Sequence, residues 1–218
     1  MHSFTEENYI KAIFKLSVNG TQDVNTNAIA EALDTKAASV TDMLRKLSAK
    51  GLVHYVRYKG VSLSEEGKLL ALQIIRKHRL WEVFLVDKLK FNWDEVHEVA
   101  EELEHITSEL LVKRLDEFLG YPKFDPHGDP IPSETGEMNL KKQKLLAEME
   151  INTSGVVLGV NDSQPLFLKF LDKIGISLGA TIKVIDKIEF DNSLEINIGN
   201  NNTILISSEV SKNIFMSV

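Results

Sequence analysis

Apolar residues recur every three or four positions through the first fifty residues, and this spacing predicts three amphipathic helices. Thr5 can cap the first helix, and Asn25 or Thr26 can open a short second one. The third helix is expected to begin after Lys36 and to end at Gly51, because glycine often terminates a helix. The N-terminal part of the chain is therefore predicted to be helical.

A short alternating segment, 52–58, follows the third helix, and a turn at Lys59-Gly60 leads into the return segment 61–63. This pattern predicts a two-stranded β-hairpin. Two helices joined by a short turn and followed by a hairpin form a winged helix-turn-helix, in which the second helix of the pair enters the major groove of DNA. A helical bundle without a DNA role is the alternative that the pattern leaves open.

The middle of the chain is also predicted to be helical. Ser64 can cap a long helix that runs to about Leu89, and Asn92, with Glu95 at the capping-box position, can open another that continues to Thr107. Residues 108–119 form a third helix with an apolar stripe. These helices carry more aliphatic surface than a monomer of this size hides easily, so a homodimer is expected.

The C-terminal part changes to a strand pattern. A Pro- and Gly-rich stretch, 120–136, and a linker around 140–148 precede the alternating segments 155–160, 181–188, 194–198 and 203–207, with a turn at Asn200-Asn201-Asn202. This pattern predicts a small SH3-like β-barrel. We therefore expect a mainly α chain with a small β part, made of a winged helix-turn-helix domain (1–72), a helical dimerisation domain (73–140) and a β domain (150–218).

The overall composition is that of an ordinary globular protein, with 43% hydrophobic and 26% charged residues. No apolar run reaches the length of a membrane span, and the N-terminus mixes charged with apolar residues, unlike a secretory signal. The chain has no cysteine, which excludes disulfides and thiolate metal sites. A cytoplasmic protein with no membrane partner is the expectation that fits these observations.

Charge is unevenly distributed along this acidic chain, whose net charge is -7. Between Thr35 and Gly60 there are six basic residues and one acid, Asp42. Such a local basic patch attracts DNA phosphates, although a charge run alone is more often a solvated helix face. We predict contacts to bases or phosphates from Thr35, Lys36, Ala37, Ser39 and Thr41, and contacts to phosphates from Arg45, Lys46, Lys50, Arg57 and Lys59.

Histidines and carboxylates share faces on two of the predicted helices. His78 and Glu82 are four residues apart, and His97, Glu101, Glu104 and His105 fall at i, i+4, i+7 and i+8. Such groups are costly to bury unless a cation compensates them, so the second stripe predicts a divalent metal site. Ligands without sulfur suit manganese, iron(II), cobalt, nickel or zinc rather than copper(I). Solvated salt-bridge faces are the alternative.

Several motifs together resemble the diphtheria toxin repressor family of metal-dependent regulators, including its manganese-transport branch. They are Asn8-Tyr9-Ile10, the winged helix, the run from Arg76 to Glu82, the run from Glu95 to His105, and the run from Asp125 to Pro132. The resemblance covers essentially the whole chain, and the combination and order of the motifs are specific. It implies that the middle domain binds metal and that the C-terminal domain is the FeoA-like barrel of this family.

The resemblance implies two neighbouring metal sites in each subunit. One uses His78, Glu82 and His97, sometimes with ligands from the barrel, for which Asp162 and Gln164 are the best-placed oxygen donors. The other uses Glu101, Glu104 and His105 together with Asn8.

Three positions depart from the family pattern. The iron-responsive branch has cysteine at position 101, so Glu101 shifts the preference toward manganese. Asn8 offers a neutral amide oxygen where the manganese branch has aspartate. Lys11 stands where that branch can carry a glutamate ligand, and a lysine ammonium cannot be a ligand. Mn²⁺ is the expected ion, with Fe²⁺ as the alternative.

The function implied by the resemblance is that of a metal-dependent, DNA-binding transcriptional repressor that controls metal-ion homeostasis. It would act as a homodimer on a palindromic operator and would not be an enzyme. A metal-independent winged-helix regulator ranks second. A metallohydrolase with the same ligands ranks third, because the sequence offers no general base or substrate cleft beyond the ligands.

Overall fold

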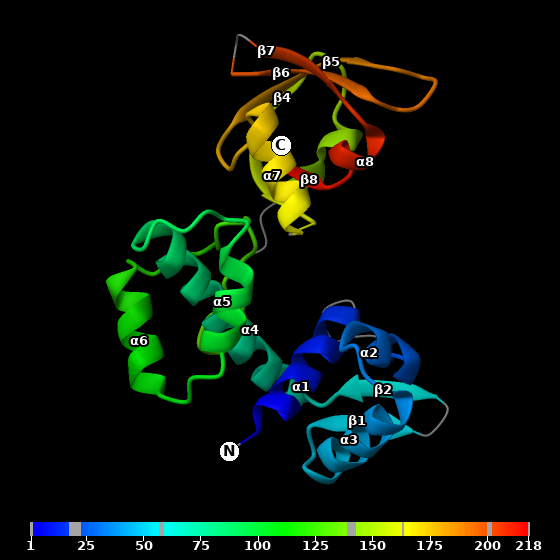
Figure 1. Ribbon diagram of the computed structural model, residues 1–218, viewed down its shortest axis with the longest axis vertical. Coiled ribbons are helices and arrows are strands. Elements are labelled where there is room, and N and C mark those ends of the chain that lie inside the picture. Colours follow the sequence, from blue (N-terminus) through cyan, green and yellow to red (C-terminus); the bar gives the residue numbers. More distant parts are fainter. Residues whose placement is uncertain are drawn as a thin grey trace. The chain divides into compact units, whose positions relative to one another are not determined.

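The structure, a computed structural model, describes residues 2–17, 23–56, 59–138, 143–162, 164–199 and 202–217. The chain forms two compact units and passes between them several times (Figure 1). The first unit consists of Met1–His78, Glu101–Glu109 and Pro132–Glu137, and the second consists of Arg79–Ala100, Leu110–Ile131 and Met138–Val218. The predicted domain limits at 72 and 140 remain predictions.

The first unit contains the predicted winged helix-turn-helix. Its elements are α1 (Phe4–Leu16), α2 (Thr26–Ala32), α3 (Ala37–Ala49), β1 (Val53–Val56) and β2 (Gly60–Leu63). Strands β1 and β2 are antiparallel, and Val24 forms a bridge to Val61 that ties the segment before α2 to the hairpin. The sequence prediction of helices followed by a hairpin is confirmed for this part of the chain.

Capping groups fix the starts of the first two helices. Asn25 caps α2 through its side chain, as one of the two predicted alternatives had it. The prediction that Thr5 caps α1 is wrong, because Ser3 and Glu6 form a reciprocal capping box and Thr5 lies inside the helix. Glu6 therefore sits in the first turn of α1, where its side chain also faces α3.

The core of the first unit comes from the apolar faces of these helices. The side chains of Ile10, Ile13, Ile29, Leu44 and Leu47 are completely buried. Burying a side chain of this size contributes about 1.5–3 kcal/mol, so the five together fix how α1, α2 and α3 pack. This packing leaves the N-terminal turn of α3 exposed at Ala37 and Ser39.

Three helices connect the two units. Helix α4 (Glu65–Asp87) begins in the first unit and ends in the second, whereas α5 (Val96–Leu103) runs from the second unit into the first. Helix α6 (Glu109–Phe118) lies almost entirely in the second unit. Within the described ranges, no helix is both long and apolar enough to cross a membrane.

Helix α5 is shorter than predicted. Asn92 and Glu95 form a turn, in which the Asn92 amide donates to the Glu95 carboxylate, and the helix begins only at Val96. It ends at Leu103 rather than at Thr107, so Glu104 and His105 lie beyond the helix. The prediction that His97, Glu101, Glu104 and His105 form one helical stripe is therefore wrong in its extent.

The β part of the second unit is a six-stranded antiparallel sheet with strand order β3-β8-β4-β5-β6-β7. The strands are β3 (Gln143–Leu145), β4 (Ser154–Val160), β5 (Thr181–Lys187), β6 (Leu194–Ile198), β7 (Asn202–Ile206) and β8 (Ile214–Ser217). Register shifts in the pairs β4–β8 and β5–β6 help the sheet to curve, as in a barrel. The predicted β domain is confirmed, although Asn200 and Asn201 of the predicted turn lie outside the described residues.

Five further elements of this domain were not predicted. Strand β3 and the 3-10 turn η2 (Leu146–Glu148) occupy part of the predicted linker, whose residues 140–142 lie outside the described residues. Helices α7 (Pro165–Ile174) and α8 (Ser208–Ser211) complete the domain together with β8. Leu146, Leu168 and Leu171 are fully buried in its core, so these elements belong to the β domain.

A short loop, 125–130, joins the helical part of the second unit to its sheet. The amide of Val160 in β4 donates to the carbonyl of His127, and Gly128 packs against Leu158. A Cβ atom at Gly128 would come within 1.8 Å of the Leu158 carbonyl oxygen, and the φ of Gly128 is +89°. Only glycine fits this position, and the close packing holds His127 in place.

Candidate metal centre

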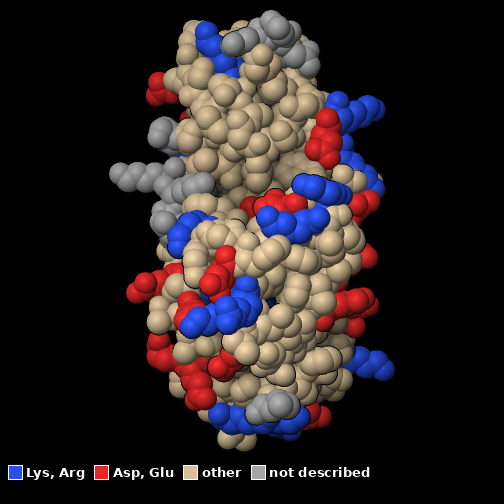
Figure 2. All heavy atoms as spheres, turned by 90° about the vertical axis from the view of Figure 1, so that its left-hand side faces the viewer, with Lys and Arg blue, Asp and Glu red and all other residues tan. Residues whose placement is uncertain are grey.

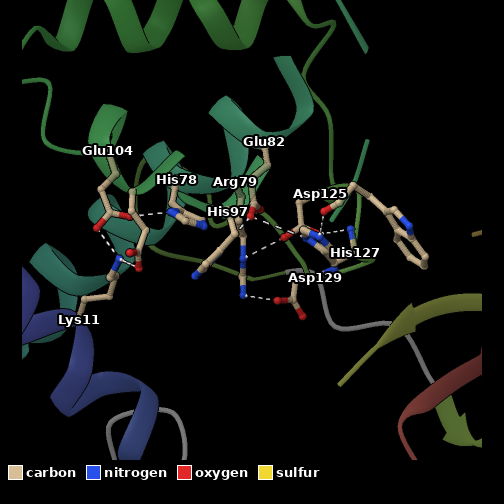
Figure 3. Close-up of polar contacts among 11 residues, drawn as sticks. Lys11, His78, Arg79, Glu82, His97, Glu104, Asp125, His127 and Asp129 are labelled. Carbon is tan, nitrogen blue, oxygen red and sulfur yellow. Dashed lines mark hydrogen bonds and ion pairs between the residues drawn. The ribbon is translucent and has the colours of Figure 1, made fainter. Parts of the chain in front are cut away.

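Glu82 on α4 lies between two histidines of the second unit. The Glu82 Oε1 atom is 3.6 Å from the His97 Nδ1 atom on α5 and 3.7 Å from the His127 Nδ1 atom in the loop 125–130. Glu82 and His127 are buried, with exposed fractions of 2% and 4%. Helices α4 and α5 and the loop 125–130 thus bring one carboxylate and two imidazoles close together (Figure 3).

Asp125 adds a second carboxylate to this group. Glu82, Asp125 and His127 can each direct one ligand atom into a space where these atoms lie within 4.8 Å of one another. The Asp125 Oδ1 atom accepts hydrogen bonds from the amides of His127 and Asp129, which shapes the loop. Its other oxygen, Oδ2, is 3.4 Å from the Arg79 Nε atom, and Arg79 also contacts Asp129 (Figure 3).

A backbone contact orients His127. Its Nε2 atom is 2.8 Å from the carbonyl oxygen of Trp93, so Nε2 carries a hydrogen and Nδ1 faces Glu82. An outer hydrogen bond of this kind is characteristic of histidines that bind metals, because it fixes the ring and leaves one nitrogen directed at the ion.

The pKa values in this group show how the buried charges compensate one another. Burial lowers the pKa of His127, but the carboxylates of Glu82 and Asp125 outweigh burial and raise it to about 9. Burial, followed by the charges of Glu82 and Asp129, raises the pKa of Asp125. In the protein without an ion, a proton on His127 therefore compensates the acidic side chains.

The donor set fits a divalent cation. An ion would replace the His127 proton as the positive charge, and the carboxylates and imidazoles supply the oxygen and nitrogen ligands that such ions bind. Glu82, His97, His127 and Asp125 are the residues of the second unit that would hold it.

A second group of acidic and basic side chains lies in the first unit, around Glu104. The Glu104 carboxylate is fully buried, and its Oε2 atom is 2.7 Å from the His78 Nδ1 atom on α4. Its Oε1 atom is 2.5 Å from the Lys11 ammonium on α1, which is also 3.2 Å from the Glu101 carboxylate. Figure 3 shows Lys11 and His78 on either side of Glu104.

His105 makes a separate connection to α1. Its Nδ1 atom is 2.6 Å from the Glu7 Oε2 atom, and its ring stacks on Phe4 with 4.7 Å between the ring centroids. Its Nε2 atom is 3.8 Å from the Glu104 Oε1 atom. Glu7 and Lys11 are the α1 residues with charged contacts to Glu104 and His105 among the described residues, and the role of Asn8 as a ligand remains a prediction.

Charge keeps Glu104 ionised despite its burial. Burial raises its pKa, but the His78 hydrogen bond and the Lys11 ammonium outweigh burial, and the net pKa is lowered. Nearby Lys77 shows the opposite balance, because burial lowers its pKa more than Glu7 and Glu104 raise it. The Glu104 group is thus compensated by a lysine.

The structure divides the sequence-predicted ligands between two groups. His97 lies with Glu82, whereas Glu101 and His105 lie with Glu104, and the Nδ1 atom of His78 contacts Glu104. Asp162 and Gln164 form the turn before α7, where the Gln164 amide donates to the Asp162 carboxylate. The role of Asp162 and Gln164 as ligands remains a prediction.

Sequence reasoning missed Asp125, His127 and Glu7. Asp125 and His127 belong to the run Asp125 to Pro132, which was used for the family resemblance and for its turn residues but not for ligands. The sequence did contain a signal, because one histidine and two aspartates stand within the five residues 125–129. Only the fold, however, brings Asp125 and His127 to Glu82.

The predicted DNA-contacting residues lie in and around α3 and on the wing. Lys36, Ala37, Ser39, Arg45 and Lys59 are exposed. Thr35 is half-buried and hydrogen-bonds to Tyr9, and the Thr41 hydroxyl donates to the Ala37 carbonyl. Arg57 lies outside the described residues.

Two of the predicted phosphate-binding lysines have an acidic partner. The Lys46 and Lys50 ammonium groups are 2.9 Å and 2.8 Å from the Glu6 Oε1 atom. They lower the pKa of Glu6 to about 2, with Lys50 as the largest cause and the Ser3 amide as the next. Lys46 remains 56% exposed, so its ammonium can still meet a phosphate.

Three known sequence families match successive parts of the chain. Residues 1–61 match the iron-dependent repressor N-terminal DNA-binding domain, residues 64–133 match the iron-dependent repressor metal-binding and dimerisation domain, and residues 144–218 match the FeoA domain. Together these matches cover nearly the whole chain in the order expected from the sequence.

Individual relatives agree with this assignment. A solved structure of a manganese-dependent transcriptional repressor in complex with manganese is 34% identical, has a TM-score of 0.85, and matches over 97% of this chain and 99% of its own. The iron-dependent repressor IdeR of Mycobacterium tuberculosis is 36% identical over 59% of this chain and 55% of its length. The diphtheria toxin repressor of Corynebacterium glutamicum is 33% identical over 62% of this chain and 59% of its length. The chain thus spans little more than half the length of these two curated relatives.

Proposed function

Because the chain belongs to the family of iron- and manganese-dependent repressors, we propose that it is a transcriptional repressor that binds DNA when it holds a divalent metal ion. The observation that carries this proposal is the group of Glu82, His97, His127 and Asp125, in which all but His97 are buried. Two buried acids and an imidazole that share so small a space are costly without a compensating cation.

The ion is Mn²⁺, with Fe²⁺ as the alternative. Carboxylate oxygens and imidazoles favour these ions, and the chain contains no cysteine that would favour softer metals. The family resemblance also assigns His78, one helical turn before Glu82 on α4, to this ligand set, and this assignment remains a prediction because the Nδ1 atom of His78 contacts Glu104. Glu101, Glu104 and His105 form a second acidic group that the family resemblance also assigns to metal.

DNA binding is assigned to the winged helix-turn-helix. The exposed start of α3, with Lys36, Ala37 and Ser39, has the small and polar side chains that reach base edges. Arg45 and Lys59 add exposed positive charge on α3 and the wing, where they can contact phosphates. We propose a palindromic operator, because two recognition helices of a symmetric dimer read related half-sites.

The homodimer is supported by apolar side chains on α6. Leu110 and Phe118 are 66% and 63% exposed, and Leu111 is 41% exposed. Figure 2 looks at the molecule from the side on which α6 lies in Figure 1, and it shows broad uncharged areas between side chains of both signs. Burying α6 against a second copy would remove this apolar surface from water.

The path of the chain suggests how the metal controls DNA binding. The ligand His97 is on α5, and the residues directly after α5, Glu104 and His105, contact α1 of the DNA-binding domain. An ion that fixes α5 against α4 and the loop 125–130 would restrict the conformations of the segment that contacts α1. The form competent to bind DNA would then be more populated.

The test is DNA affinity with and without the ion. A duplex is first selected from a random pool in the presence of Mn²⁺, and its affinity for the full chain is measured by fluorescence anisotropy in Mn²⁺ and in EDTA. We expect affinity at least tenfold higher with Mn²⁺, and loss of this difference in Glu82→Ala. The matched control is Glu98→Ala, which removes an exposed glutamate from α5. Equal affinity in both conditions would point to a metal-independent regulator.

A further inference from the structure

The contacts of Lys11 leave little room for a second metal ion in the first unit. The ammonium group lies between Glu104 and Glu101, 2.5 Å and 3.2 Å from their carboxylates. The remaining Glu104 oxygen contacts the His78 Nδ1 atom, and the His105 Nδ1 atom contacts Glu7. Both carboxylate oxygens of Glu104 and the Nδ1 atom of His105 therefore already have polar partners.

Burial makes the Lys11 contact strong and specific. Lys11 is 7% exposed and Glu104 is fully buried, so water screens their attraction only weakly. A divalent ion bound to Glu104 would lie close to the ammonium group, and two buried cations repel each other. The second ligand set therefore does not fit an added ion while Lys11 remains in place.

We propose that Lys11 is a built-in cation that takes the position of the second metal ion, so that each chain binds a single divalent ion, at Glu82. Lys11 also holds α1 to the segment 101–109 whether or not the protein contains metal. This inference rests on the proposed function, since it presumes that the Glu82 site binds an ion.

Metal stoichiometry tests the first part of the inference. Full-length protein is dialysed against Mn²⁺, and free and bound ion are measured by electron paramagnetic resonance. The wild type is compared with Lys11→Arg, which keeps the cation, and with Lys11→Met, which keeps most of the aliphatic side chain and removes the charge. We expect one ion per chain in the wild type and in Lys11→Arg. A second ion should bind to Lys11→Met, because Glu101 and Glu104 lose their cation.

The metal stoichiometry distinguishes failure of this inference from failure of the proposed function. Two ions per wild-type chain, or a folded Lys11→Met protein that binds only one, would overturn the assignment of Lys11. No bound ion in the wild type would instead overturn the proposed function. Thermal unfolding identifies any variant that fails to fold, and Lys11→Gln then replaces Lys11→Met as the neutral variant.

Hydrogen–deuterium exchange in EDTA tests the second part. The amides of 101–109 should exchange at least tenfold faster in Lys11→Met than in the wild type, and Lys11→Arg should resemble the wild type. The matched control is Lys15→Met, one turn further along α1 and exposed. Equal exchange in Lys11→Met and wild type would show that Lys11 does not hold this segment.

Discussion

The groups around Glu82 and Glu104 are built from the same residue types but differ in their positive charge. Next to Glu82 it is a proton on His127, which a metal ion can displace, whereas Arg79 contacts Asp125 and Asp129. Around Glu104 it is the ammonium of Lys11, which is covalently part of α1 and cannot be exchanged for an ion. The comparison shows that histidines and carboxylates define a metal site only together with the groups that compensate them.

The largest expected effect on metal affinity comes from Glu82→Gln. The carboxylate is the common neighbour of His97 and His127, and the amide keeps its shape but removes its charge. We expect Mn²⁺ affinity to fall by about 100-fold or more, since this change removes a charged candidate ligand itself, and loss of an outer-shell partner alone costs about 10–100-fold. Isothermal titration calorimetry measures the affinity.

The matched control for this variant is Glu98→Gln, an exposed acid on α5. The nuclear magnetic resonance titration of His127 gives a second measurement. Its pKa should fall from about 9, because the Glu82 hydrogen bond is the largest cause that raises it. Unchanged Mn²⁺ affinity in Glu82→Gln would mean that Glu82 is not a metal ligand, and the proposed difference between the Glu82 and Glu104 groups would then be wrong.

A smaller effect is expected for His127→Gln, which removes one nitrogen donor and keeps the charge of Glu82. Mn²⁺ affinity should fall by about 10–100-fold, which is less than for Glu82→Gln because the lost donor is neutral and the fall resembles that for loss of an outer-shell partner. The control is His54→Gln, on an exposed position of β1. If His127→Gln bound Mn²⁺ like the wild type, the loop 125–130 would not belong to the site.

Much of this fold could be predicted from local sequence patterns. The winged helix-turn-helix follows from helical periodicity, from Asn25 at the start of α2 and from the alternation after Gly51. Helix α7 was not predicted, although Pro165 stands at its start and proline is common in the first turn of a helix. Tertiary packing of Leu168 and Leu171 favours the helix there.

The metal centre was less predictable, because its members come from distant parts of the chain. Spacing on one helix identified His78 and Glu82, and the second stripe included His97. The early end of α5 at Leu103 separates Glu104 and His105 from that stripe, and no periodicity rule brings Asp125 and His127 to Glu82. Lys11 was noted as a lysine that cannot bind metal, but its contact with Glu104 required the fold.

Glu104→Gln is expected to have little effect on metal affinity and a clear effect on stability. Among the described residues it leaves the buried Lys11 ammonium with Glu101 as its remaining acidic partner, so the free energy of unfolding should fall by about 2 kcal/mol. Mn²⁺ affinity at Glu82 should stay within about threefold of the wild type, because Lys11 rather than an ion compensates Glu104. Urea unfolding and calorimetry measure the two quantities, with Glu102→Gln as the control. A large loss of Mn²⁺ affinity would assign Glu104 to the metal site after all.

The smallest effect concerns Glu6, which lies outside both groups and should not change metal affinity. Lys50, the Ser3 amide and Lys46 lower its pKa to about 2 against an ordinary value of 4.5. Because the pKa is lower in the folded protein, Glu6 stabilises the fold above pH 4.5, and this contribution is lost as the pH falls from 4.5 toward 2. The expected contribution of Glu6 to the free energy of unfolding is about 1 kcal/mol, since the partly exposed lysines are screened by water.

Urea unfolding at pH 6 and pH 3 should therefore show a weaker pH dependence of stability in Glu6→Gln than in the wild type. The control is Glu31→Gln, which changes an exposed acid on α2 and should resemble the wild type. Equal pH dependence in all three proteins would show that the Glu6 contacts with Lys46 and Lys50 add nothing to the stability of the first unit.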